Sequence, residues 1–111
     1  MTEAIIHRPQ EHRFTCEVDG HACVLDYHLN GQTMTITHTG VPEAVGGRGL
    51  AGALTRFALD HARLEGWSIV PMCSYSALYI DRHPSYQDLV VGSWVRKPDE
   101  AFRLFFLIFF V

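Results

Sequence analysis

HTGVPEAVGGRGLA, residues 38–51, is the most informative segment of the chain, because the spacing of apolar residues changes there. Before it, apolar residues alternate with polar ones, as in a β-strand; after it, Leu50, Leu54 and Ala58 recur at helical spacing. Glycines let the backbone approach a ligand closely, and the first N–H groups of a helix favour negative charge. The stretch therefore predicts a strand-to-helix turn suited to a phosphate group, although many such turns bind nothing.

Two nucleotide-binding motifs do not fit this turn. Its glycines lack the GxGxxG spacing of dinucleotide-binding folds, and the Lys-Ser/Thr pair of a P-loop is missing. Neither hydride transfer nor nucleotide hydrolysis is indicated.

Upstream of the turn, the pattern predicts an antiparallel β-meander. Strands are expected over residues 14–18, 22–29 and 32–38. The dipeptides between them, Asp19-Gly20 and Asn30-Gly31, favour tight hairpin turns.

The third of these strands carries a candidate base. It places Met34, Ile36 and His38 on one face, so His38 is expected on the buried side of the sheet. A histidine there is either a general base or, more commonly, a hydrogen-bonded structural residue.

Downstream, the pattern predicts a helix, a strand and a second helix. The first helix is expected over residues 49–65 with Gly66 as its C-cap, and a buried strand over 67–72 follows. Because a helix connects that strand to the third one, the two should be parallel. A short helix over 75–83, capped by the Ser74 hydroxyl, should end before Pro84. The fold class is therefore α+β.

Length and composition fit one globular domain. A chain of 111 residues with 48% hydrophobic and 19% charged residues supports a single modest core. The net charge of -3 gives no reason to expect nucleic acid or an anionic membrane as a partner. Three cysteines without paired spacing and seven scattered histidines predict neither a disulfide framework nor a metal site. The N-terminal residues do not read as a secretory signal, so a cytoplasmic location is expected.

The C-terminal residues differ in character from the rest. We expect the domain over residues 1–97 and a hydrophobic tail over 98–111, which ends in LFFLIFFV. That run is too short for a membrane span, which needs about 20 residues. It is either a buried strand or subunit contact, or a sticky end.

A second group of candidate residues follows the strand at 67–72. Pro71 cannot donate a ladder hydrogen bond, so this strand should separate from its neighbour there and leave a slot for an extended ligand. Cys73 precedes a helix, where a thiolate is favoured, but many such cysteines are inert. Tyr75 and Tyr79 share one helix face; a phenol there is either a proton donor or a packing residue.

Taken together, these residues resemble the short GNAT-like (GCN5-related) N-acetyltransferases, minimal single-domain members of an acetyl-CoA-binding superfamily. The resemblance covers roughly residues 14–89. It rests on four motifs in order: His38-Thr39 with Val41-Pro42, Gly47-Arg48-Gly49-Leu50-Ala51, Pro71-x-Cys73-x-Tyr75, and Arg82-His83-Pro84 with Tyr86. It implies a GNAT-like mixed sheet, in which the meander is followed by a β-α-β acetyl-CoA-binding unit and a short C-terminal helix.

The resemblance also implies a cofactor site. The expected acetyl-CoA-binding residues are Val41, Gly46, Gly47, Arg48, Gly49, Leu50, Ala51, Cys73 and Tyr75. Gly46 stands where the family has Arg or Gln, so one side-chain contact to the diphosphate is lost. The pantetheine arm would lie between the strands that end near Val41 and Cys73.

Two hypotheses for function remain open on the sequence. The first is an acetyltransferase with an unidentified acceptor, most simply an amine. The acetyl group is transferred either directly to the acceptor or first to Cys73. Either Tyr79 or Cys73 protonates the leaving thiolate, and His38 is a candidate base. The second is a non-catalytic acetyl-CoA-binding or protein-interaction module, and a ligand-free α+β domain is a third, simpler reading. The tail or an edge strand would be the contact in a homodimer.

Overall fold

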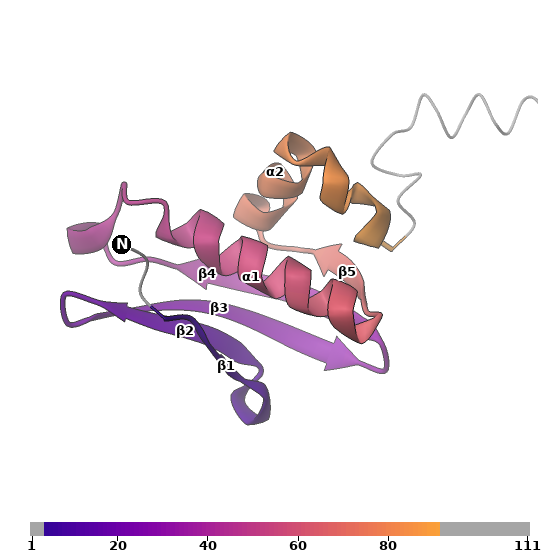
Figure 1. The fold of residues 1–111 in the computed structure, drawn as a ribbon, viewed down its shortest axis with the longest axis horizontal. Helices are drawn as coiled ribbons and strands as arrows, with labels where there is room; N and C mark the ends of the chain where they lie inside the picture. Colours follow the sequence, from indigo (N-terminus) through magenta and orange to yellow (C-terminus); the bar gives the residue numbers. More distant parts are fainter. Residues whose placement is uncertain (1–3, 92–111) are drawn as a thin grey trace, which may run out of the picture.

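The computed structural model describes residues 4–91, which form one five-stranded sheet with two α-helices beside it (Figure 1). Strands lie in the order β1-β2-β3-β4-β5. The elements are β1 Ile6–Arg8, β2 Arg13–Val18, β3 His21–Asn30, β4 Thr33–Gly40, α1 Leu50–Glu65, β5 Ser68–Pro71 and α2 Ser74–Arg82, with 3-10 turns η1 Pro9–Glu11, η2 Glu43–Val45 and η3 Pro84–Leu89. The expected α+β class and mixed sheet are confirmed.

The meander forms as its turn residues predict. Asp19 and Gly20 both have positive φ, 52° and 77°, which matches the twist of a two-residue hairpin between β2 and β3. Gly31 at φ 63° closes the turn between β3 and β4. The sequence pattern missed β1, a three-residue edge strand that pairs antiparallel with β2. His7 fixes it, because its ring stacks on Phe14 with centroids 4.3 Å apart.

A β-bulge in β4 corrects the expectation for His38. Tyr27 pairs with Ile36, whereas Asp26 pairs with His38, so Thr37 is the extra residue. One extra residue reverses the alternation of the strand, because side chains of a strand change face at every step. His38 is therefore exposed on the outer face, and Thr39, opposite the buried Leu25, is on the inner one.

Helix α1 covers the inner face of the sheet and closes the core. Its buried residues Leu54, Ala58, Leu59 and Ala62 lie at helical spacing, as predicted. They join apolar residues of all the long strands in one cluster, including the fully buried Phe14, Leu25, Met34 and Ile36. Gly66, at φ 76°, ends the helix as its C-cap.

Strand β5 runs parallel to β4, as expected from the helix between them. Helix α2 then begins at Ser74 itself, with Cys73 at the N-cap and no side-chain capping bond, so the expected Ser74 cap is wrong. Within residues 4–91, no helix has both the length and the apolar character to cross a membrane. The predicted boundary at residue 97 and the tail over 98–111 lie outside the described residues.

Candidate functional site

The glycine-rich turn leads from β4 into α1 along the edge of the core. Val41 packs against the core, and Val45, which is 1% exposed, is part of the core and holds the turn against it. Gly47 and Gly49 then take left-handed backbone conformations, with φ of 78° and 76°. Nothing lies within 4 Å of where a Cβ would stand at either position, so the backbone here is open to an incoming group.

The N-terminus of α1 carries no side-chain cap. Gly49 is the N-cap residue and offers no side chain to accept from the first N–H groups of the helix. Leu50 is buried and holds the first turn in place, while Gly46 to Gly49 are exposed. An anion at this point would meet backbone N–H groups and the positive end of a 16-residue helix.

Residues 46–50 form what we call the cradle. Arg48, which lies within it, is bound through its side chain to the β2–β3 hairpin. Its Nη1 donates to Asp19 Oδ2 at 2.8 Å, so the turn is tied to the tip of the β2–β3 hairpin. Both side chains are about half exposed or more, at 49% and 65%, and such a surface pair contributes little to stability. Arg48 is therefore available to another anion at small cost.

Strands β4 and β5 stop pairing beside the turn. Their ladder ends at Ile36 and Pro71, while β4 continues to Gly40. The N–H groups of Met72 and Cys73 both donate to the Ile36 carbonyl, at 3.1 and 3.0 Å, which turns the chain away into α2. Pro71 has no N–H to extend the ladder. Pairing thus extends through Pro71 and ends because the chain leaves the sheet for α2. A slot for a ligand between the two strands stays a prediction.

Cys73 lies just beyond the end of this ladder, half-buried, with its thiol 3.7 Å from the Thr39 hydroxyl. Burial alone would raise the pKa of Cys73. Hydrogen bonds from the Ser76 and Tyr75 backbone and from the Thr39 and Ser76 hydroxyls outweigh burial, so the pKa of the thiol lies below its ordinary value. Thr39 reaches Cys73 only because the bulge turned it inward.

Tyr75 and Tyr79 lie on one face of α2, as predicted, with ring centroids 6.3 Å apart. They face Gly52 of α1: a Cβ there would lie 3.2 Å from Tyr75 Oη and 3.6 Å from Tyr79 Cε2. The absence of a side chain at Gly52 therefore lets the two helices approach. Glycine is unfavourable inside a helix, so its presence at position 52 could have indicated a close contact there. The sequence pattern alone did not single it out.

Tyr79 is fixed by its neighbours. Its ring stacks on His83 with centroids 3.9 Å apart, and His83 Nδ1 lies 2.7 Å from the Tyr79 carbonyl oxygen. Burial, with smaller contributions from Tyr75 and Asp60, raises the pKa of Tyr79 above its ordinary value. The phenol is therefore protonated at neutral pH, as a proton donor must be.

The structure gathers most of the predicted residues but not all on one face. The turn from Gly46 to Ala51, the thiol of Cys73 and the tyrosines of α2 lie on the α1 side of the sheet. His38 lies on the other side of β4, beside Gly40, where a Cβ would be 2.9 Å from His38 Nε2. Asp19 and Thr39 are contacts that the sequence did not assign, because their partners are far along the chain.

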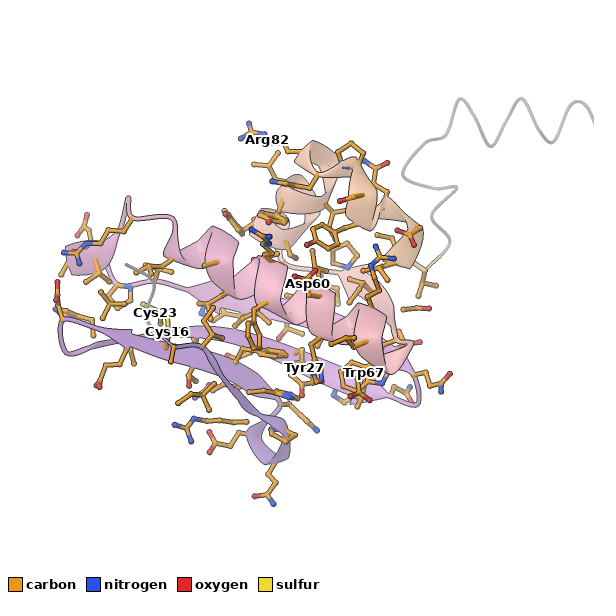
Figure 2. All side chains as sticks on the ribbon, viewed as in Figure 1. Cys16, Cys23, Tyr27, Asp60, Trp67 and Arg82 are labelled. Carbon is orange, nitrogen blue, oxygen red and sulfur yellow. The ribbon has the colours of Figure 1, made fainter. Side chains whose placement is uncertain are left out.

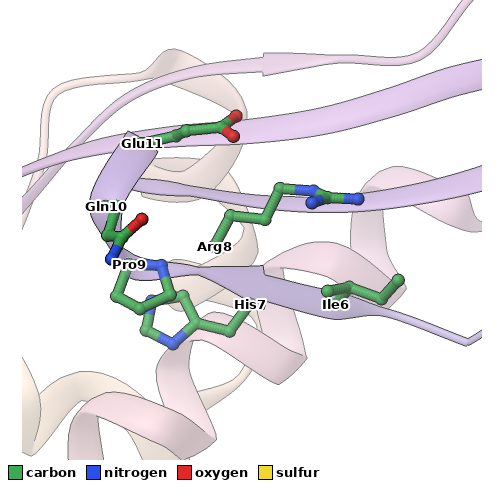
Figure 3. A pocket seen from close by; sticks show the side chains of 6 residues that line it. All are labelled: Ile6, His7, Arg8, Pro9, Gln10 and Glu11. Atoms are coloured by element: carbon green, nitrogen blue, oxygen red, sulfur yellow. The ribbon is translucent and has the colours of Figure 1, made fainter.

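Among the residues that the structure describes, hollows lie also at the β1 end of the sheet. One is formed by the consecutive residues 6–11 (Figure 3), and another by β1, β2 and the start of β3. The first draws on one segment only and brings together no groups from separate elements, so we assign it no chemistry. In residues 4–91, no three His, Cys, Asp or Glu side chains gather closely enough for a metal ion.

Comparison with known proteins gives two matches. The family model described as GCN5-related N-acetyl-transferase matches residues 13–89. The chain is also similar to the NMR solution structure of a GCN5-like candidate N-acetyltransferase from Staphylococcus aureus. The two are 27% identical with a TM-score of 0.65, over 80% of this chain and 88% of that one.

Proposed function

The chain belongs to the GCN5-related N-acetyltransferase family, and on that basis we propose that it binds acetyl-CoA at the turn before α1 and transfers the acetyl group to an amine. The observation that carries the proposal is the uncapped N-terminus of α1 beside the end of the β4–β5 ladder. The first turns of α1 and α2 lie close together, because a Cβ at Gly52 would be 3.2 Å from Tyr75 Oη. When bound, acetyl-CoA supplies an acetyl group already activated as a thioester.

The backbone of the turn accounts for the diphosphate. Gly46 to Gly49 are exposed, and we assign the anion to the N–H groups of Gly47, Arg48, Gly49 and Leu50, which need no side chain to hold it. This offsets the loss of the Arg or Gln that family members carry at Gly46. Arg48 can add its charge by leaving Asp19, because the pair between them is exposed.

The groups around the end of the β4–β5 ladder account for proton transfer. Tyr79 Oη holds its proton at neutral pH and Cys73 gives its proton up more readily than an ordinary thiol, so Tyr79 is the better donor to a departing thiolate. His38 lies on the face of the sheet opposite Cys73 and Tyr79, so it serves as a base only for an acceptor that reaches the thioester from that face. Direct transfer needs no covalent intermediate, so we prefer it to a route through an acetylated Cys73.

Titration with coenzyme A tests the cofactor site. Gly49→Glu places a carboxylate in the cradle, and Gly31→Glu is its matched control. Gly31 also has positive φ, 63°, and open space around it, but it lies in the β3–β4 turn at the far end of β4. We expect the parent and Gly31→Glu to bind coenzyme A equally, and folded Gly49→Glu to bind weakly or not at all.

Release of free coenzyme A from acetyl-CoA, with and without a panel of amines, then tests catalysis. Acceleration by an amine that Tyr79→Phe reduces supports the enzyme, whereas saturable binding without acceleration by any amine supports the non-catalytic module. Equal binding by both glutamate variants would refute the proposed position of the diphosphate.

A further inference from the structure

Cys16 and Cys23 lie opposite each other in the β2–β3 hairpin. They are register partners in a ladder that runs without interruption from Arg13 to Val18 along β2. Directly opposite residues point to the same face of a sheet, and here both side chains point into the core, 5% and 0% exposed. Figure 2 labels both near the tip of the hairpin. Both are present as thiols.

The spacing of this pair suits a disulfide. Opposite residues in antiparallel strands have Cα atoms about 4.5 to 5.5 Å apart, within the roughly 4.4 to 6.8 Å that disulfides span. The bond would therefore close without moving the strands apart or shifting their register. This register follows from the two-residue turn at Asp19-Gly20, which pairs Val18 with His21 and therefore Cys16 with Cys23.

Whether the two cysteines form a hydrogen-bonded or a non-hydrogen-bonded pair of the ladder bears on how easily the disulfide would be reduced. In a hairpin closed by a two-residue turn, the pair that flanks the turn, here Val18 and His21, is of the hydrogen-bonded kind, and the kinds alternate along the ladder. Cys16 and Cys23 are therefore also a hydrogen-bonded pair. In such a pair the Cβ atoms are farther apart than in a non-hydrogen-bonded pair, and farther than the relaxed disulfide value of about 3.8 Å. Closing that gap strains the bond, and strained disulfides are easily reduced.

We propose that Cys16 and Cys23 are a redox modification site, which forms a reversible cross-strand disulfide on exposure to a peroxide. One cysteine, as its thiolate, attacks a peroxide oxygen and becomes a sulfenic acid as one water leaves. The second thiol attacks that sulfur, the S–S bond forms and a second water leaves. Two thiols lose two electrons, and one hydrogen peroxide is reduced to two waters.

The site lies beside the cradle but does not depend on its function. The same hairpin carries Asp19, which holds Arg48. Formation of the disulfide can therefore be tested on the purified protein without any acetyl-CoA, whatever the outcome for the proposed activity.

Mass spectrometry of the folded full-length protein after limited hydrogen peroxide tests the proposal. Trypsin releases residues 14–48, which contain Cys16 and Cys23, separately from residues 64–82, which contain Cys73. We expect the 14–48 fragment to lose the mass of two hydrogen atoms and to regain it with dithiothreitol. Thiols counted in denaturant should fall from three to one.

Two variants separate the pair from the half-buried thiol of Cys73. In Cys73→Ser both remaining thiols should disappear together, and in Cys23→Ser no internal disulfide should form. A fragment 14–48 that keeps its reduced mass while Cys73 is oxidised, that gains oxygen, or that becomes linked to 64–82 would overturn the proposal. Because the parent and Cys73→Ser suffice for this decision, it stands even if Cys23→Ser does not fold.

Discussion

Replacing Gly52 by alanine sets two opposing effects against each other at the contact between α1 and α2. Alanine is favoured over glycine inside a helix by about 1 kcal/mol. Against this, the new Cβ would lie 3.2 Å from Tyr75 Oη, which is closer than ordinary van der Waals contact. Tyr75 is 37% exposed, so its hydroxyl can move outward at a cost of about 0.5 kcal/mol for a strained rotamer.

The helix preference should therefore win. We expect Gly52→Ala to be more stable by about 0.5 kcal/mol, which corresponds to a rise in Tm of about 2 to 4 °C for a domain of this size. The displaced Tyr75 should at the same time weaken coenzyme A binding, because we place Tyr75 at the cofactor site. Thermal unfolding followed by circular dichroism and calorimetric titration measure the two effects separately.

A double variant identifies the atom responsible. Tyr75→Phe removes the hydroxyl that the new Cβ meets, so Gly52→Ala should stabilise Tyr75→Phe more than it stabilises the parent. If Gly52→Ala instead destabilises both backgrounds equally, the helices clash through their backbones and the reasoning is wrong.

Two further perturbations test the electrostatics. Burial, together with the neighbouring His61, lowers the pKa of His7 below its ordinary 6.5. At acidic pH the folded protein therefore binds fewer protons than the unfolded chain. The free energy of unfolding should fall as the pH drops below about 6.5. His7→Phe keeps the stacked ring and should flatten that part of the urea-unfolding profile against pH; an unchanged slope would assign it to other groups. Thr39→Val removes a hydroxyl that stabilises the Cys73 thiolate, so the alkylation of Cys73 by iodoacetamide should slow at neutral pH and its pH midpoint should move up. An unaltered midpoint would show that groups of α2, the Ser76 and Tyr75 backbone and the Ser76 hydroxyl, lower the pKa of the thiol without Thr39.

Much of the fold follows from local sequence. Asp19-Gly20 favours a two-residue hairpin because both positions accept positive φ, and the structure has that turn. The change from alternating to helical spacing near Gly49 locates the start of α1, and Gly66 marks its end. These signals depend on neighbouring residues only, so they can be recognised without the tertiary structure.

The positions of the candidate chemical groups depend on contacts between distant residues. An extra residue at Thr37 moves His38 to the outer face and turns Thr39 toward Cys73, 34 positions away. No local pattern encodes this bulge, because it arises from how β4 pairs with β3. Asp19 likewise meets Arg48 only after the hairpin and the glycine turn have folded side by side.

The elements from β2 to α2, their order and the glycine-rich turn are thus readable from the sequence, because backbone propensity and hydrophobic period act over a few residues. The pairing of β4 with β3 settles which side of β4 the residues beyond Ile36 face, and only the folded chain brings Thr39 to Cys73 and Asp19 to Arg48. One extra residue in a strand reverses the face of every side chain beyond it.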